Sequence, residues 1–284
     1  MRYLLFAIMS SASIALVLKL FRAQKGNRYG ILLGNYLTCV LIALLSVPDR
    51  RLILGCSTST LYFGVAAGVF FVAALVFMQS SIKANGATLT TAFTKLGLLV
   101  SLIMSLVWFK ERPNLYQVIG MGLVLAALII IHFGEKGSSK TKKGRGVWLL
   151  ILTLLGGGLG DSTAKVFERY GRSAESIVYF FWLFLTACLI TAILAFVEYR
   201  QTKKRVLVVE LLAGVIVGVP NYYSSYLLLR ALQQLPAFLV YTLFSTGTIL
   251  LVMLFSLIFF KERLNKRQLF GIVLIFGSLI LLNI

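Results

Sequence analysis

The chain has 284 residues, of which 59% are hydrophobic and only 13% are charged, and its mean hydropathy is +0.93. A water-soluble domain needs far more polar surface than this composition supplies, so we predict an all-α integral membrane protein. The formal net charge is +19, but the basic residues lie in loops beside apolar runs. Lipid headgroups are the expected partners of such residues, and we expect no nucleic-acid partner.

Apolar runs follow one another along the whole chain, and each has about the 20 residues that a helix needs to cross a ~30 Å bilayer core. The ten runs are 3–21, 29–47, 59–80, 87–108, 115–133, 146–167, 176–198, 207–229, 237–260 and 267–283. The sequence lacks the alternating ten-residue pattern that is typical of a membrane barrel. We therefore predict ten transmembrane helices joined by short loops.

The cysteines Cys39, Cys56 and Cys188 show no paired spacing, and the chain has one histidine. Neither a disulfide framework nor a metal site is indicated. We expect no cofactor, no metal and no catalytic residues, and we expect partners to be a small-molecule substrate and membrane lipid.

The two halves of the chain are similar to each other. Residues 93–131 align with residues 244–282 at an offset of 151. The matched positions include "FKER" at 109–112 and 260–263, Gly120 and Gly271, and, at an offset of 150, the GxxxG pairs Gly64/Gly68 and Gly214/Gly218. Glycines at this spacing allow close helix contact in lipid, so we interpret them as packing residues.

Five spans are an odd number, so the second half must enter the membrane from the opposite side. We predict two five-helix inverted-topology repeats, at residues 1–133 and 146–284, with residues 134–145 as the connecting loop. Such repeats are a device of secondary transporters, in which the two halves exchange conformations and a cavity changes the side to which it opens. The pattern favours transport over a duplication retained for packing alone.

This doubled layout, with "FKER" preceding an apolar span that opens near a glycine in each half, resembles the drug/metabolite transporter superfamily. Within it, the chain is similar to the EamA-type domain, present twice, over nearly its whole length. The resemblance implies a carrier of small polar metabolites or drugs that works by alternating access, as an exporter or exchanger, in the cell membrane.

The resemblance and the charge distribution imply opposite orientations. The resemblance implies that both termini are cytoplasmic. Loops after odd-numbered spans, counted with the adjoining span ends, carry 18 of the 28 Lys and Arg, and the positive-inside rule then places both termini outside. An even number of spans is compatible with either orientation.

Lys95 is the first candidate for substrate binding, because it is the only charge in the run 87–108. A lysine at the centre of a membrane helix costs roughly 2.5–3.5 kcal/mol on insertion scales. It lies about 12 Å along the helix, where even an extended side chain does not easily reach the headgroups. Its repeat mate is Thr246. The alternative is a buried lysine satisfied by hydroxyl and carbonyl groups.

Two further segments are candidate substrate contacts. Asp161 is the deepest acid of the sixth run. Its depth in the membrane differs from that of Lys95 by about 10 Å, which allows either a direct ion pair or a shared cavity. In the eighth run, Pro220 predicts an interrupted helix, followed at once by Asn221, Tyr222 and Tyr223. A broken helix with polar groups at mid-depth is typical of a transporter binding site, and a simple kink is the alternative. Asn35 and Gln79 are weaker candidates.

Two other functions compete with a carrier. A membrane-embedded enzyme or flippase acting on a lipid or lipid-linked substrate would need acid, base or metal groups near the interface, and the sequence offers no carboxylate cluster. A structural or accessory subunit would gain little from a mid-membrane lysine and aspartate. We therefore predict a transporter and not an enzyme.

Overall fold

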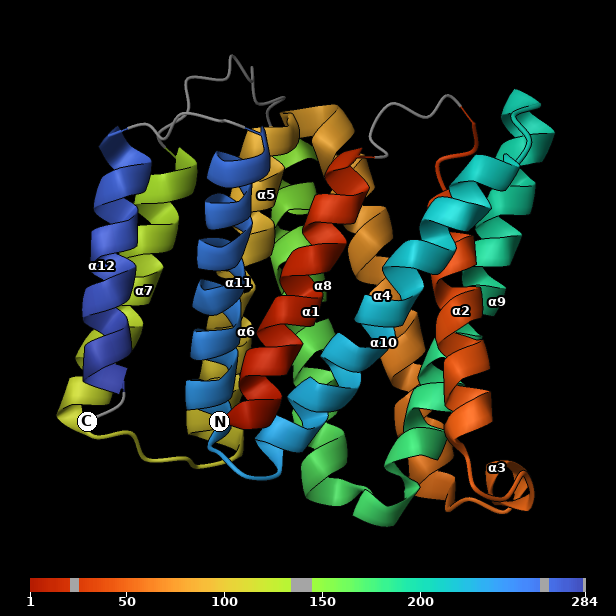
Figure 1. Cartoon of the computed structure of the whole chain (residues 1–284), viewed down its shortest axis with the longest axis horizontal. Helices are drawn as coiled ribbons and strands as arrows, with labels where there is room; N and C mark the ends of the chain where they lie inside the picture. Colours follow the sequence, from red (N-terminus) through yellow and green to blue (C-terminus); the bar gives the residue numbers. More distant parts are fainter. Residues whose placement is uncertain (21–25, 134–144, 261–265, 283–284) are drawn as a thin grey trace. The chain divides into compact units, whose positions relative to one another are not determined.

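The computed structural model describes residues 1–20, 26–133, 145–260 and 266–282, and every regular element in these residues is helical (Figure 1). The elements are α1 Arg2–Leu20, α2 Gly30–Ser46, α3 Arg51–Leu54, α4 Thr58–Asn85, α5 Ala87–Leu96, α6 Leu98–Ile103, the π-helix η1 Met104–Trp108, α7 Leu115–Phe133, α8 Arg145–Tyr170, the 3₁₀ turn η2 Ser173–Glu175, α9 Ser176–Thr202, α10 Val208–Leu232, α11 Ala237–Phe260 and α12 Lys266–Leu282. Apart from Arg145 and Phe260, the expected connecting loop and the second "FKER" motif lie outside the described residues.

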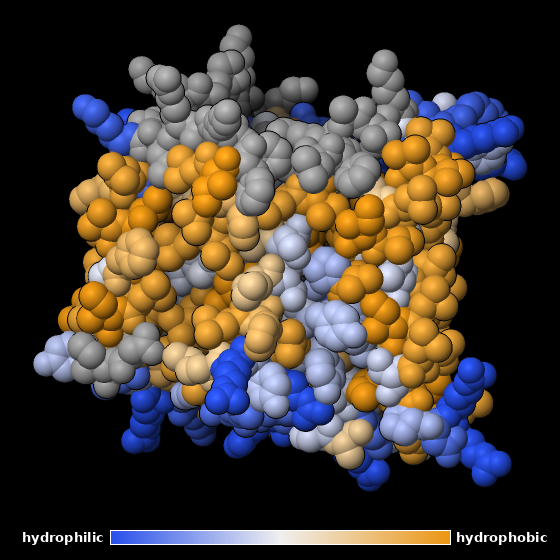
Figure 2. Space-filling view, in the orientation of Figure 1, coloured by the Kyte–Doolittle hydropathy of each residue, from blue (hydrophilic) through white to orange (hydrophobic). Residues whose placement is uncertain are grey.

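Long helices lie over the predicted apolar runs. Six stretches among the described residues are long and apolar enough to cross a membrane, and α1, α2 and α7 contain shorter apolar helices. The 28 residues of α4 extend over about 42 Å, so this helix is longer than the ~30 Å core of a bilayer is thick. Figure 2 shows mostly hydrophobic residues over the middle of the helices, with a smaller polar area among them, and hydrophilic residues along the lower edge.

The chain forms two compact units, and neither coincides with a predicted repeat. Unit 1 contains residues 1–72 and 163–233, and unit 2 contains residues 73–162 and 234–284. Each unit therefore takes helices from both halves of the sequence. α4 and α8 contribute one end to each unit.

In unit 1, two helix crossings place their glycines against corresponding atoms of the neighbouring helix. A Cβ added at Gly214 or Gly218 of α10 would collide with the backbone of Ile31 and Asn35 and with the side chain of Thr38, on α2. A Cβ added at Gly64 or Gly68 of α4 would meet the corresponding atoms of Tyr179, Leu183 and Thr186, on α9. The GxxxG pairs are thus packing residues, as predicted, and they serve two crossings of the same geometry.

In unit 2, α7 and α12 lie side by side and make a reciprocal contact (Figure 1). Gly120, near the start of α7, packs against Ser278 and Leu282 at the end of α12. Gly271, near the start of α12, packs against Ala127 and Ile131 at the end of α7. The two helices are therefore antiparallel, and each contact is the other one displaced by 151 residues, which is the pattern of a two-fold relation.

We predict that Gly214→Ala lowers the free energy of unfolding by roughly 1–3 kcal/mol, because the added methyl group would overlap the backbone of α2. Gly122 on α7 is the matched control, since no atom lies within 4 Å of a Cβ added there. Gly122→Ala should be neutral or stabilising by up to about 1 kcal/mol. Thermal unfolding in detergent compares the two variants, and equal shifts of the two midpoints would contradict the close packing of α10 on α2.

Candidate functional site

The helix that carries Lys95 is irregular next to it, within an apolar span that runs from Leu89 to Trp108. Around Gly97 the hydrogen bonds shorten to three residues, from Gly97 N–H to Thr94 O (3.1 Å) and from Val100 N–H to Gly97 O (2.9 Å). The backbone of Gly97 stays in the helical region, with φ −52° and ψ −26°, so α5, which ends at Leu96, continues into α6, which begins at Leu98. Further along, the helix changes to the π-helix η1. Lys95 therefore lies in the turn just before the tightening at Gly97.

The irregularity at Gly97 is packed tightly against α8. A Cβ added at Gly158 would overlap Gly97 O and Val100, so only glycine allows this approach. Ser101 Oγ donates a hydrogen bond to Gly158 O (3.2 Å), Ser162 Oγ donates to the same Gly158 O (2.7 Å), and the two hydroxyl oxygens lie 3.3 Å apart. Glycines and serines together hold α5 and α6 on the surface of α8.

Asp161 lies on α8, three residues after Gly158, and is in the same unit as Lys95. Its side chain is exposed and that of Lys95 is half-buried. Their opposite charges are close enough to attract each other, but in the described part of unit 2 no ion pair within 4.0 Å joins them. Tyr241 of α11 donates a hydrogen bond from its hydroxyl to the backbone O of Asp161 (2.8 Å). Three elements thus meet around these two charges.

The expected interruption at Pro220 is wrong, because α10 continues from Val208 to Leu232 with Pro220 inside it. Proline removes one amide donor and leaves the carbonyl of the preceding turn unpaired, but membrane helices tolerate this where neighbours surround them. α10 packs against both α1 and α2.

The three residues after Pro220 do not share one direction, since successive helix residues are turned by about 100°. Asn221 is half-buried and donates from Nδ2 to Asn35 Oδ1 (3.1 Å). Tyr222 is buried in an aromatic cluster with Tyr226 and Phe180, and Tyr223 is 47% exposed. All three belong to unit 1 and Lys95 to unit 2. That they contact the solute stays a prediction.

The role of Glu111 in the first "FKER" motif was missed. Its carboxylate accepts hydrogen bonds from the backbone N–H groups of Ala237 (2.9 Å) and Phe238 (3.2 Å), at the start of α11, and from Ser105 Oγ. It therefore caps the N-terminus of α11. The appearance of the same acid in both halves was the available signal.

Comparisons with known proteins give a family, a relative and a solved structure that this chain resembles. The EamA-like transporter family matches the chain twice, over residues 1–133 and 144–284. An uncharacterized protein of Haemophilus influenzae is 23% identical over 282 residues, which is 96% of this chain and 94% of that protein. A protein crystal structure with 16% sequence identity covers 99% of this chain and 95% of its own, with a TM-score of 0.74. This likeness shows that the two proteins share a fold.

We predict that Glu111→Ala destabilises the protein by about 0.5–2 kcal/mol, the usual cost of losing an N-cap. The N–H groups of Ala237 and Phe238 would lose their acceptor, and hydrogen exchange in the first turn of α11 should accelerate. Arg112→Ala, at the exposed neighbouring residue, is the control and should change stability by no more than about 0.5 kcal/mol. Unchanged exchange in Glu111→Ala would show that α11 does not depend on this cap.

Proposed function

The chain belongs to the EamA-like transporter family, and on this premise we propose that it carries small polar solutes across the membrane by alternating access. In this proposal Lys95 binds the negatively charged group of the solute. The carrier consists of two five-helix inverted repeats, at residues 1–133 and 146–284, and acts in the cell membrane as an exporter or exchanger.

The reciprocal contact of α7 and α12 supports the inverted repeat. A two-fold axis that relates antiparallel helices runs perpendicular to them, and for helices that cross a bilayer this direction lies in the membrane plane. The two glycine crossings in unit 1 follow the same rule, because exchanging the two halves of the chain converts one crossing into the other. Two halves of equal fold and opposite orientation can exchange conformations, which is the basis of alternating access.

The position of Lys95 within an apolar span, beside the helix irregularity at Gly97, carries the proposal for the solute. Ionisable residues at membrane depth mark the substrate pathways of transporters. A cation there attracts a carboxylate or phosphate more strongly than it would in water, because the effective dielectric constant is lower. Asp161 attracts the same lysine, so it supplies a counter-charge when no solute is bound. An arriving anion displaces this interaction.

We predict that Lys95→Met folds and abolishes uptake of anionic solutes into liposomes, because the variant removes the charge and also its insertion cost. Lys95→Arg keeps the charge with a different geometry and should retain only part of the activity. Lys83→Met is the matched control, since Lys83 is exposed in the last turn of α4, and its uptake should equal that of the wild type. Full uptake by a folded Lys95→Met variant would remove Lys95 from the site.

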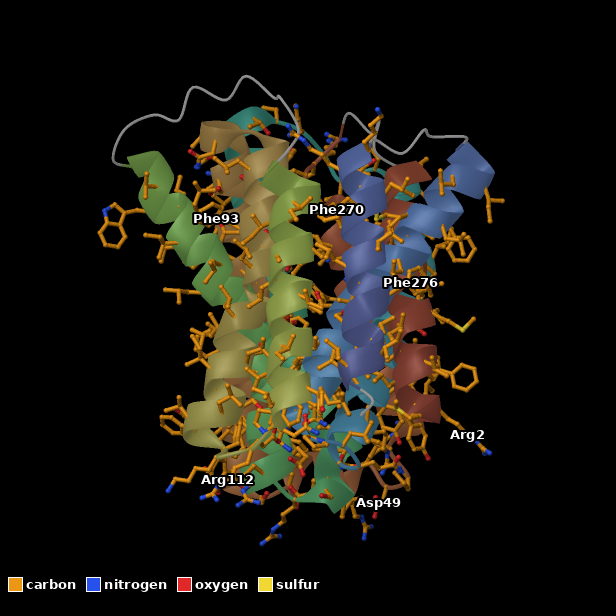
Figure 3. The ribbon with its side chains drawn as sticks, turned by 90° about the vertical axis from the view of Figure 1, so that its left-hand side faces the viewer. Arg2, Asp49, Phe93, Arg112, Phe270 and Phe276 are labelled. Atoms are coloured by element: carbon orange, nitrogen blue, oxygen red, sulfur yellow. The ribbon has the colours of Figure 1, made fainter. Side chains whose placement is uncertain are left out.

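We also predict that Arg112 and Lys266 lie on opposite faces of the membrane. Both are exposed, and Figure 3 shows Arg112 at the end of the unit 2 helices opposite to Phe270, which is close to Lys266 in α12. Single cysteines at the two positions, in a chain whose three native cysteines are replaced by serine, report the sidedness. In sealed vesicles of one orientation a membrane-impermeant maleimide should label only one of them. Labelling of both, or of neither until lysis, would favour a parallel repeat.

A further inference from the structure

A small polar cluster lies at the crossing of α2 and α10 in unit 1. Asn221 Nδ2 donates a hydrogen bond to Asn35 Oδ1 (3.1 Å) and is 3.8 Å from Cys39 Sγ. The Cys39 thiol donates to Gly218 O (3.3 Å) and lies 3.8 Å from Asn35 Oδ1. Asn35 is 4% exposed, and Asn221 is half-buried. None of the contacts described for the pair involves a charged residue.

The packing of this crossing does not require the amides, since the chain contains the same crossing without them. Where α4 crosses α9, Leu183 takes the place of Asn35 and Ala187 the place of Cys39. The repeat mate of Asn221 is Phe71, at the offset of 150 that relates the glycines. The apolar crossing has the same glycine contacts. The amides therefore have a use other than holding two helices together.

One side of each amide is left without a partner. In the part of the chain that the structure describes, no hydrogen bond is formed by Asn35 Nδ2 or Asn221 Oδ1. The hydrogen bond between the amides stabilises the helix crossing only slightly, because interhelical hydrogen bonds in membranes average about 0.6 kcal/mol. The pair therefore leaves one amide donor, on Asn35, and one amide acceptor, on Asn221, available for a further partner.

We propose that Asn35 and Asn221 bind an uncharged group of the transported solute that both donates and accepts a hydrogen bond, namely a hydroxyl or a carboxamide. Such a group satisfies the free N–H of Asn35 and the free oxygen of Asn221 together. An isosteric methyl group satisfies neither and leaves both unpaired, which is how buried polar groups reject an apolar analogue. This inference rests on the proposed function and adds the chemical class that the carrier selects.

The test compares solutes that differ only at this group. Lactate and isobutyrate differ by a hydroxyl in place of a methyl group, and succinamate and 4-methylpentanoate by a carboxamide in place of an isopropyl group. Binding is measured as thermal stabilisation of the purified protein, and transport as uptake into liposomes. The quantity of interest is the ratio of the apparent affinities within each pair. Every pair keeps its carboxylate, so the two members carry the same charge and differ only at the tested group.

For the wild type we expect a preference of tenfold or more for the polar member of at least one pair. Asn35→Leu with Asn221→Phe, which copies the repeat mates, should reduce this preference to within twofold while the protein still folds. Asn221→Ser removes the second amide with little change in volume and serves if the double variant does not fold. Ser224→Ala on the same helix, which loses a hydrogen bond to Ala7 O (3.2 Å), is the matched control and should keep the wild-type preference.

The outcomes separate this inference from the proposed function. Equal binding of both members of each pair by the wild type, or binding of neither, overturns the role of the amides. An unchanged preference in a folded amide variant also overturns it and leaves Asn35 and Asn221 as helix-packing residues. Binding with the expected preference but no uptake would overturn transport while the amide site stands.

Discussion

Close approach of helices through glycine is the constraint on which the rest of this structure depends. Lipid tails are as apolar as leucine, so helices in a bilayer associate through van der Waals packing and not through burial of apolar surface. The crossings of α2 with α10, of α4 with α9 and of α7 with α12 all place a glycine where a side chain would overlap a neighbouring helix. The crossing of α5/α6 with α8 at Gly97 and Gly158 uses the same device. The crossing of α5/α6 with α8 also positions Lys95 and Asp161.

The symmetric scaffold and the asymmetric chemistry are separate layers of the structure. The glycine contacts recur in both halves of the chain, whereas the polar residues proposed to bind the solute do not. Lys95 has Thr246 as its mate, and Asn35 has Leu183. A carrier needs both layers, since equal halves allow exchange of conformations, and recognition of an asymmetric solute requires different side chains on the two halves. The polar residues lie where one half departs from the other.

The sequence was sufficient for the helical class, the extent of the long helices and the glycine crossings, because each depends on local composition or on the internal repeat. The irregularity beside Lys95 could not be predicted from residues 87–108 alone. A single glycine costs a helix only about 1 kcal/mol, and the tightening at Gly97 coincides with the approach of Gly158 from α8. The prediction at Pro220 was wrong, because proline favours a helix break but α10 continues through it. Glu111 caps a helix that begins 126 residues later, a partner that no local pattern identifies.

Trans-stimulation of uptake tests the central claim most directly. Liposomes containing the purified protein are loaded with an unlabelled anionic solute that the protein binds, and the entry of the same labelled solute is followed. In many alternating-access carriers the binding site reorients from the inner to the outer face faster when it is loaded than when it is empty. Internal solute should therefore accelerate entry of the labelled solute. The account predicts this acceleration in the wild type. Uptake that is absent, or that is indifferent to solute on the far side, would contradict alternating access for this chain.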